Sequence, residues 1–200
     1  MKIKRMIVGM FLTNCYLLIS DKEPRSRPRR ESTLLRGRET SLRDEAAIID
    51  PGGGSKEILK EVQDNNLNLK YIILTHSHPD HIFSTFKIKQ KTKAQVFIHE
   101  AEKDFIKFKV DKFLREGDRI KIGKTLLKVL HTPGHSKGSI CLLGDKYIFT
   151  GDTIFKDGYG RTDLPGGSPG DLKSSLQRLS KFFKKGIIIY PGHGEIFKIK

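Results

Sequence analysis

Three histidines and an aspartate fall within six consecutive residues of this 200-residue chain: His76, His78, Asp80 and His81. They directly follow the apolar run 71–74, which is typical of a short buried strand, so their side chains would leave the strand's end in a loop. Residues two apart in an extended segment share one face, which places the first two imidazoles together. The chain holds only seven histidines, so chance clustering in a surface loop is the weaker interpretation. Imidazole and carboxylate ligands suit zinc, iron or manganese, and the spacing therefore predicts a metal site.

Three later segments complete a longer pattern. They carry His135 in Thr-Pro-Gly-His-Ser, Asp152 in Thr-Gly-Asp-Thr and His193 in Pro-Gly-His-Gly. Together with the first cluster, read as His-x-His-x-Asp-His, this order of motifs resembles the metallo-β-lactamase-fold hydrolases over nearly the whole chain. Residues 160–167, Gly-Arg-Thr-Asp-Leu-Pro-Gly-Gly, are similar to the short, glyoxalase II-like branch of that superfamily.

The resemblance implies an α/β (α+β) fold, an αββα sandwich of two mixed β-sheets flanked by helices. It also implies two divalent metal ions, zinc in the first place, with iron or manganese as alternatives. By resemblance, the first ion would be held by His76, His78 and His135. The second would be held by Asp80, His81 and His193, with Asp152 bridging both.

A hydrolase of this kind would cleave a thioester such as S-lactoylglutathione through a hydroxide shared by the two ions. Two metal ions about 3.5–4 Å apart generate hydroxide at neutral pH and stabilise the oxyanion that develops on the carbonyl. Asp80 would then be both a ligand and the catalytic residue that orients the hydroxide. Many β-lactamases of this fold carry cysteine where Asp152 stands, which argues against antibiotic hydrolysis.

Two other functions remain open at this stage. A persulfide dioxygenase of the same superfamily uses one iron, held by counterparts of His76, His135 and Asp152. A nucleic-acid enzyme is the less favoured possibility. Arg161 is a candidate for binding a substrate carboxylate, although a structural ion pair with Asp163 is the favoured interpretation.

The charge of the chain is strongly basic, at +15 with a pI near 9.8. The lysines are spread along the chain and mixed with acidic residues, as in 57–61, which indicates a solvated surface rather than a nucleic-acid footprint. A small-molecule thioester is therefore the expected partner and nucleic acid is not. The length suits one domain spanning 1–200, and the sequence does not predict an oligomeric state.

Cys15 and Cys141 both lie in apolar runs and are expected to be buried free thiols, consistent with a reducing cytoplasm. The start of the chain resembles a signal peptide in its basic and apolar residues. However, it lacks a small-x-small cleavage site, so residues 2–20 are expected to form two strands. No apolar run approaches the ~18 residues of a membrane span. We therefore expect a cytoplasmic protein without a membrane segment.

Residues 21–45 differ in composition from the rest of the chain. They contain seven of the twelve arginines but only one lysine, together with six acidic residues. Pro24, Pro28 and the shortage of large apolar side chains predict an exposed, partly disordered Arg-rich loop. Relatives of this type cross the hairpin with a shorter turn, so the segment is interpreted as a tolerated insertion rather than a partner-binding or substrate-gating arm.

The remaining pattern alternates strands and helices, which positions each motif at a strand end. In the first half of the chain we expect a strand at 46–50, a helix capped by Ser55, the strand ending at 74, a helix at about 79–91 and a strand at 95–98. A helical stretch that includes Phe105, Ile106 and Phe113 should follow His99. In the second half we expect hairpins at 118–130 and 139–150, a helix that starts at Pro169 with Ser168 as cap and ends at Gly186, and a strand at 187–190. The ligand loops therefore follow four strands, and we expect them to converge at one edge of a rigid scaffold.

Overall fold

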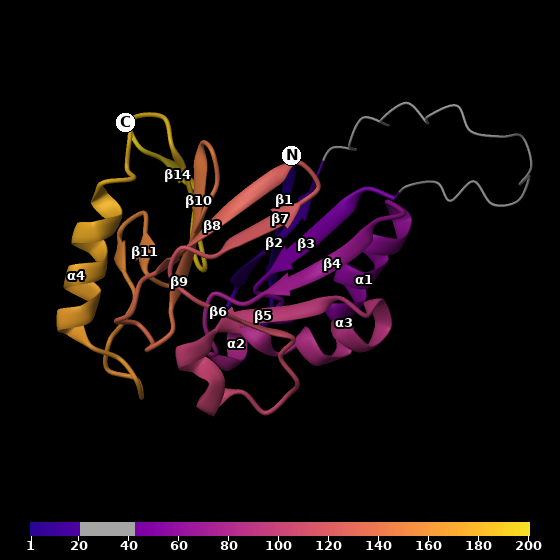
Figure 1. Ribbon diagram of the computed structural model, residues 1–200, viewed down its shortest axis with the longest axis horizontal. Helices are drawn as coiled ribbons and strands as arrows, with labels where there is room; N and C mark the ends of the chain where they lie inside the picture. Colours follow the sequence, from indigo (N-terminus) through magenta and orange to yellow (C-terminus); the bar gives the residue numbers. More distant parts are fainter. Residues whose placement is uncertain (21–42) are drawn as a thin grey trace, which may run out of the picture.

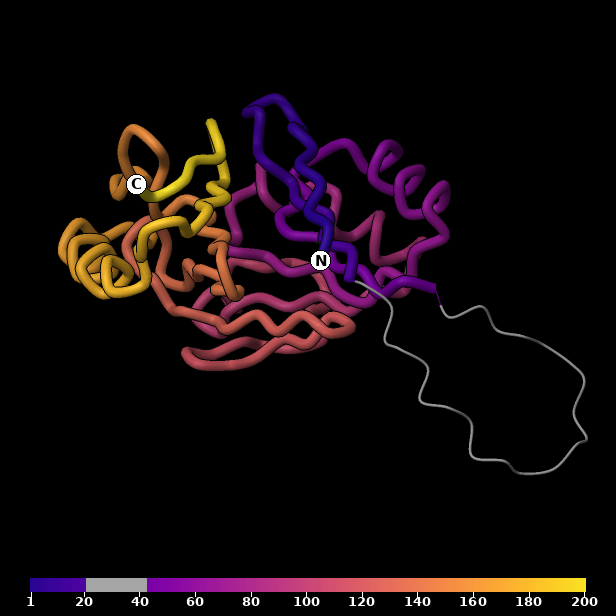
Figure 2. Tube along the Cα trace, turned by 90° about the horizontal axis from the view of Figure 1, so that it is seen from above, coloured from indigo at the N-terminus to yellow at the C-terminus, as the bar shows by residue number. Residues whose placement is uncertain are grey.

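Two facing β-sheets form the centre of the molecule, and helices cover their outer faces (Figure 1). The structure is a computed structural model that describes residues 1–20 and 43–200. Viewed from above, the purple segments of the first half and the orange segments of the second half lie on opposite sides (Figure 2). This is the predicted αββα arrangement. The proposed insertion at 21–45 falls, up to residue 42, outside the described residues.

The first sheet has six strands in the order β1-β2-β3-β4-β5-β6. Their bounds are β1 Lys2–Val8, β2 Thr13–Ile19, β3 Glu45–Ile49, β4 Asn68–Ile73, β5 Gln95–His99 and β6 Lys112–Leu114. The first three strands are antiparallel to one another, whereas β3 to β6 run parallel. The two strands expected within residues 2–20 are confirmed.

The second sheet has the order β14-β13-β10-β9-β8-β7. Its strands are β7 Arg119–Ile122, β8 Thr125–His131, β9 Ile140–Leu143, β10 Tyr147–Gly151, β13 Ile188–Pro191 and β14 Phe197–Lys198. A separate two-stranded ribbon, β11 Ile154–Phe155 and β12 Gly158–Tyr159, follows β10. The two predicted hairpins are β7–β8 and β9–β10.

Five helical segments accompany the sheets in the described part of the chain. They are α1 Ser55–Asp64, α2 Pro79–Ile82, α3 Thr85–Thr92, the 3-10 helix η1 Glu100–Phe105 and α4 Pro169–Ser180. Helices α1 and α3 pack on the outer face of the first sheet through Ile58 and Ile88. Helix α4 packs on the second sheet through Leu179.

Alternating side chains of β2 show why the chain forms three apolar layers. Cys15 and Leu17 face the layer under α1 and α3, whereas Tyr16 and Leu18 face the second sheet. Successive residues of a strand point to opposite faces, so a strand buried on both faces is apolar throughout. Cys141 contributes to the third layer, under α4, and both cysteines are buried and free as expected.

The strands that precede the motif loops end at a common edge. Strand β8 is antiparallel to β9, β9 is antiparallel to β10, and β10 is parallel to β13. Strands β8, β10 and β13 therefore run in the same direction. The Ile140 amide donates to the carbonyl of Thr75 at 3.0 Å, which joins the end of β4 to this edge of the other sheet. Loops from both sheets thus meet at one site.

One segment predicted as a single helix forms two helices instead. The segment at about 79–91 forms two helices, α2 and α3, with a break at residues 83–84. The Ser84 amide donates to the carbonyl of Pro51 at 2.9 Å instead of continuing the ladder of α2. This bond ties the start of α3 to the turn after β3, and the two short helices follow from it.

The helical stretch expected after His99 is also wrong in part. Only η1 is helical, and Phe113 lies in β6, which pairs in parallel with β5. This pairing supplies backbone hydrogen bonds that override the local helical pattern, and Asp111 secures it by accepting from the Val96 amide at 2.8 Å. Side-chain pattern alone did not reveal this edge strand.

Two predicted helix boundaries need correction, and one cap is confirmed. Gly54, with φ +60°, is the N-cap of α1 in place of Ser55, which is its first residue. Helix α4 ends at Ser180, before the glycine at 186. The Ser168 hydroxyl accepts from the Asp171 amide at 3.2 Å and caps α4 as predicted.

No helix within residues 1–20 and 43–200 is long and apolar enough to cross a membrane.

Candidate metal centre

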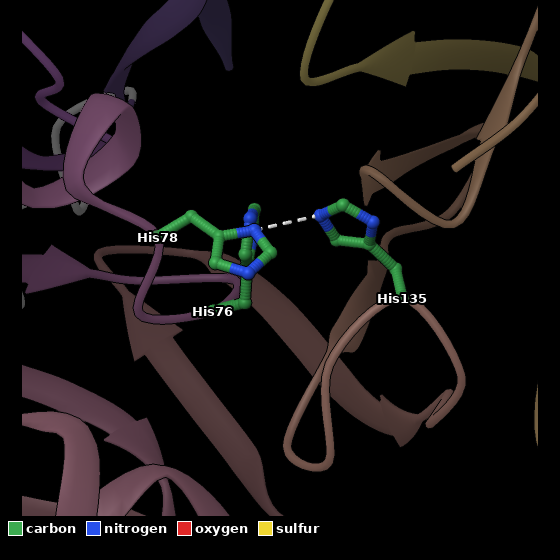
Figure 3. Close-up of side chains that lie close together, drawn as sticks. All are labelled: His76, His78 and His135. Carbon is green, nitrogen blue, oxygen red and sulfur yellow. Dashed lines mark hydrogen bonds between the residues drawn. The ribbon is translucent and has the colours of Figure 1, made fainter. Parts of the chain in front are cut away.

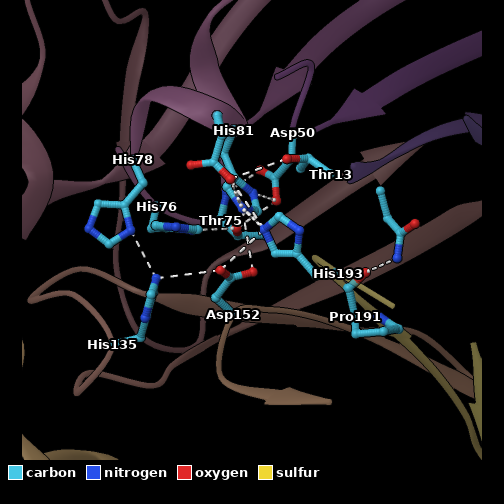
Figure 4. A network of polar contacts seen from close by, with 12 residues as sticks. Thr13, Asp50, Thr75, His76, His78, His81, His135, Asp152, Pro191 and His193 are labelled. Atoms are coloured by element: carbon cyan, nitrogen blue, oxygen red, sulfur yellow. Dashed lines mark hydrogen bonds and ion pairs between the residues drawn. The ribbon is translucent and has the colours of Figure 1, made fainter. Parts of the chain in front are cut away.

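The seven side chains named as ligands from the sequence lie together at the common sheet edge (Figure 4). They form three overlapping groups, each with ligand atoms within 4.8 Å of one another: His76, His78 and His135; His76, His81 and Asp152; and Asp80, His81 and His193. These groups include the two triads expected for two ions, with Asp152 near both. Whether the groups hold metal stays a prediction.

The first triad joins loops of the two sheets. His76 and His78 follow β4, and His135 approaches them from the loop after β8 (Figure 3). His78 Nδ1 and His135 Nε2 are 2.9 Å apart, and the rings of His76 and His135 lie nearly perpendicular with centroids at 4.9 Å. Three imidazole nitrogens thus point into one small space.

The second triad lies beside the first, and Asp152 contacts both. Its Oδ2 lies 3.5 Å from His135 Nε2 of the first triad and 3.5 Å from His193 Nε2 of the second. Its Oδ1 lies 3.4 Å from His81 Nε2. A carboxylate between two sets of imidazoles is the geometry expected of a bridging ligand.

Four of the five histidines have their second ring nitrogen held by a protein oxygen. The partners of the Nδ1 atoms are the hydroxyl of Thr75 for His76 (3.0 Å), the carboxylate of Asp50 for His81 (2.9 Å), the carbonyl of Arg161 for His135 (2.8 Å) and the carbonyl of Phe11 for His193 (3.1 Å). The Nδ1–H group donates in each case, so in the neutral ring Nε2 is the acceptor that faces the centre. Such outer contacts orient imidazoles for metal binding.

Asp50 organises this outer layer and was not predicted as a site residue. It is 1% exposed and has φ +51°. Its carboxylate accepts from the Thr75 amide at 2.8 Å and the Thr75 hydroxyl at 2.6 Å, in addition to the His81 ring. The Thr75 hydroxyl, which donates to Asp50, therefore accepts from His76. The Pro-Gly-Gly that follows Asp50 indicated a turn but not this role.

Two distant segments position the remaining ligand loops. Asn14 in β2 donates from Nδ2 to the carbonyls of Pro191 and Gly194, each at 3.0 Å, and fastens the loop of His193. The Ser168 amide at the start of α4 donates to the carbonyl of Gly134 at 2.8 Å and fastens the loop of His135. The centre therefore depends on both sheets and on α4.

Electrostatic interactions divide the site into a neutral and a charged half. Burial, followed by neighbouring histidines, lowers the pKa of His76 well below its usual value. Burial also opposes the charged form of His81, but Asp152 and Asp50 outweigh it and raise its pKa well above the usual value. Burial would raise the pKa of Asp80, yet His193 and His81 hold it below the usual range. Metal binding requires neutral imidazoles and ionised carboxylates, so an ion bound at His81 would displace the proton that Asp152 and Asp50 favour there.

Two buried atoms show that the donor set fits a metal. His76 Nε2 and Asp152 Oδ1 have no hydrogen-bond partner among the described residues, although both lie inside the cluster. Unpartnered buried polar atoms are costly, and binding of an ion is one reason for them to persist. Imidazoles with carboxylates match zinc or iron. The residues present therefore fit the implied metal ions.

Comparison with known proteins agrees with this geometry. Residues 32–193 match the model of the "Metallo-beta-lactamase superfamily". The chain belongs to this superfamily. Hydroxyacylglutathione hydrolase GloC of Haemophilus influenzae is 35% identical over 170 residues, which cover 74% of this chain and 80% of that protein. This metallo-β-lactamase superfamily protein is thus a metallo-hydrolase by family.

Solved structures of the superfamily share the fold. The crystal structure of BLEG-1 B3 metallo-beta-lactamase aligns with a TM-score of 0.83 at 26% identity, covering 99% of this chain and 94% of that one. TTHA1623 in a di-iron-bound form aligns with a TM-score of 0.78 at 26% identity, covering 98% and 94% of the two chains. The predicted metallo-β-lactamase fold is confirmed.

Arg161, the candidate substrate residue, contributes to the metallo-hydrolase site through its backbone. Its carbonyl accepts from His135, whereas its guanidinium forms two hydrogen bonds with the Asp163 carboxylate, at 2.7 and 2.6 Å. Both side chains are exposed. The ion pair expected from the sequence is present, and a role in substrate binding stays a prediction.

The two histidines left out of the ligand set stack on each other. The His99 and His131 rings lie 3.9 Å apart with an interplanar angle of 12°. His131 Nε2 donates to the carbonyl of Lys137 at 2.9 Å, so it supports the loop behind His135 without joining the ligands. His99 is buried, and its Nδ1 accepts from the Ala101 amide at 3.3 Å.

Replacing His99 by phenylalanine is expected to flatten the pH dependence of stability. Burial, followed by His131, lowers the pKa of His99 from its usual 6.5 to about 4. The unfolded chain therefore binds a proton between these values that the folded chain does not, and stability falls as the pH drops from 6.5 to 4. Urea unfolding of metal-stripped wild type and His99→Phe across this range would measure the difference. Parallel curves would contradict the assignment.

Proposed function

We propose that this chain is a dinuclear metal-dependent hydrolase that cleaves thioesters. The observation that carries the proposal is the position of Asp152, whose two oxygens lie within 3.5 Å of histidines from both triads. Two divalent ions bound there, with zinc as the first candidate, would supply hydroxide at neutral pH and stabilise negative charge on the substrate carbonyl oxygen. No serine or cysteine nucleophile is needed.

Asp80 is the side chain that we assign to orienting the attacking water. Its Oδ2 accepts from the Thr13 hydroxyl at 3.2 Å and lies 3.2 Å from His193 Nε2. These contacts hold the carboxylate in place, and its lowered pKa keeps it ionised, so that it can accept a hydrogen bond from water. His193 is held in turn by Phe11, and this pair links Asp80 to the β1–β2 turn.

The thioester class is supported by the similarity to hydroxyacylglutathione hydrolase GloC. Asp152 occupies the position where many β-lactamases of this fold carry cysteine, which favours a thioester over a β-lactam. The expected substrate is a small acyl thioester, with S-lactoylglutathione as the first candidate. Nucleic acid is not part of the proposal.

A persulfide dioxygenase is the second candidate. Its single iron would use the counterparts of His76, His135 and Asp152, and these lie in the same cluster here. The observation that favours it is the structural likeness to ETHE1 from Myxococcus xanthus, which aligns with a TM-score of 0.74 at 26% identity and covers 100% of this chain and 80% of that one. Iron content and oxygen uptake separate this reaction from hydrolysis.

Thiol release from S-lactoylglutathione by the zinc-loaded full chain, measured without oxygen, tests the proposal. We expect rapid release that falls by about 10²–10³-fold in Asp80→Ala. Asp145→Ala, which changes an exposed aspartate in the β9–β10 turn, is the matched control and should retain activity. A β-lactam assayed in parallel should be hydrolysed more slowly.

No thiol release from fully metallated protein would refute the thioester assignment. Oxygen consumption with glutathione persulfide by the iron-loaded chain would then favour the dioxygenase. Faster hydrolysis of the β-lactam than of the thioester would instead favour a lactamase.

A further inference from the structure

Glu102 is a buried carboxylate that lies outside the ligand set. It belongs to η1 and is only 1% exposed. Its Oε2 accepts from the amide and the hydroxyl of Ser77, the former at 3.2 Å. Its Oε1 accepts from the Ser136 hydroxyl at 2.7 Å and the Gly138 amide at 2.6 Å. Each oxygen therefore receives one backbone and one hydroxyl donor.

The donors belong to the two loops that form the first triad. Ser77 stands between His76 and His78 in the loop after β4, and Ser136 directly follows His135 in the loop after β8. These loops come from different sheets. One carboxylate thus connects the two halves of the triad, at a point one residue along the chain from each of its histidines.

The surroundings of Glu102 are shaped for this contact. A Cβ atom at Gly138 would lie 2.5 Å from Glu102 Cγ, so a side chain there would displace the carboxylate. No lysine or arginine within residues 1–20 and 43–200 forms an ion pair with Glu102, so hydrogen bonds from the two loops stabilise its buried charge. Hydrogen bonds to an ionised acceptor are stronger than those between neutral groups, so the bonds to Glu102 hold the two loops firmly in place.

The ligands of the second triad are supported by residues other than Glu102. Asp80 is contacted by Thr13, His81 by Asp50 and His193 by Phe11. None of these three ligands or their supports is hydrogen-bonded to Glu102 in the described structure. Loss of Glu102 therefore affects the geometry of one triad and spares the other.

We propose that Glu102 is the positioning residue of the first metal site, setting the separation of the His76–His78 and His135 loops. Glu102 would therefore affect the affinity of the chain for the ion at the first site and not for the ion at the second. The inference rests on the metal centre of the proposed function but is independent of the substrate. Outer partners of metal ligands typically change metal affinity about 10- to 100-fold, which sets the expected size.

The test compares retention of zinc by the metal-loaded full chain in graded concentrations of a chelator. In Glu102→Gln the amide nitrogen cannot accept hydrogen bonds, so two of the four are lost. We expect one ion to be removed at about 10- to 100-fold lower chelator concentration and the other as in wild type. Glu100→Gln, which changes the exposed neighbour paired with Arg115, should leave both steps unchanged.

Two further variants keep the result decisive. Ser77→Ala removes one donor to Glu102 and leaves the charge in place, so it should weaken the same ion to a smaller extent. Combining Glu102→Gln with His193→Ala, which removes a ligand of the second triad, should weaken the ion that remains. Unchanged chelator curves for Glu102→Gln, or equal weakening of both ions, would overturn the inference. Failure of wild type to bind zinc would overturn the proposed function as well.

Discussion

Asp152→Ala is expected to lower kcat/KM for thioester hydrolysis by about a thousandfold or more. The side chain lies between the two triads, so its removal would take away a carboxylate that both ions could share. The loss should exceed the 10- to 100-fold that an outer partner typically contributes.

Steady-state kinetics and metal content, measured on the same preparations, would check this result. Asp157→Ala is the matched control, because this aspartate lies exposed in the turn between β11 and β12. Asp152→Asn keeps the shape of the side chain and separates the loss of charge from a loss of packing. Near-normal turnover by Asp152→Ala with two bound ions would contradict the bridging role.

Among the described glycines, Gly52→Ala is expected to be the most destabilising replacement of glycine by alanine. A Cβ atom at Gly52 would lie 1.4 Å from the carbonyl oxygen of Asp80, which is rigid backbone. Either the turn after β3 or α2 must move, and α2 carries Asp80 and His81. We expect a loss of about 3 kcal/mol or more in the free energy of unfolding, at or above the upper range for overpacking.

Urea unfolding of the metal-free chain would measure this loss, and zinc titration would show weaker binding of the second ion. Gly170→Ala provides the control, because a Cβ atom there meets nothing within 4 Å. Gly170 lies in the first turn of α4, where alanine is favoured over glycine, so this variant should be as stable as wild type or slightly more stable. Equal stability of Gly52→Ala and wild type would show that the turn is not tightly packed.

Local pattern was sufficient to predict the first ligand loop, because an uncommon residue type recurs there at close spacing, whereas the later ligand loops were assigned by the resemblance to a family. His76, His78 and His81 stand within six residues, and each later ligand follows an apolar strand. The three-layer core was predictable in the same way, since strands apolar on both faces need covering on both faces. The capped start of α4 at Ser168 is likewise a local feature.

The supports of the site could not be predicted because they depend on contacts between distant segments. Asp50 lies 25 residues from Thr75, and Glu102 lies 34 residues from Ser136. Nothing in the sequence near Glu102 distinguishes it from the exposed Glu100. The break between α2 and α3 has the same origin, because it depends on a bond from Ser84 to Pro51.

The most direct test of the metal centre is the number of ions that one chain retains. The full chain would be equilibrated with zinc and freed of unbound metal by gel filtration. Its zinc content would then be measured by inductively coupled plasma mass spectrometry. Seven ligands in two triads with a shared aspartate predict two zinc ions per chain. One ion per chain, or none, would contradict the dinuclear site on which the account depends.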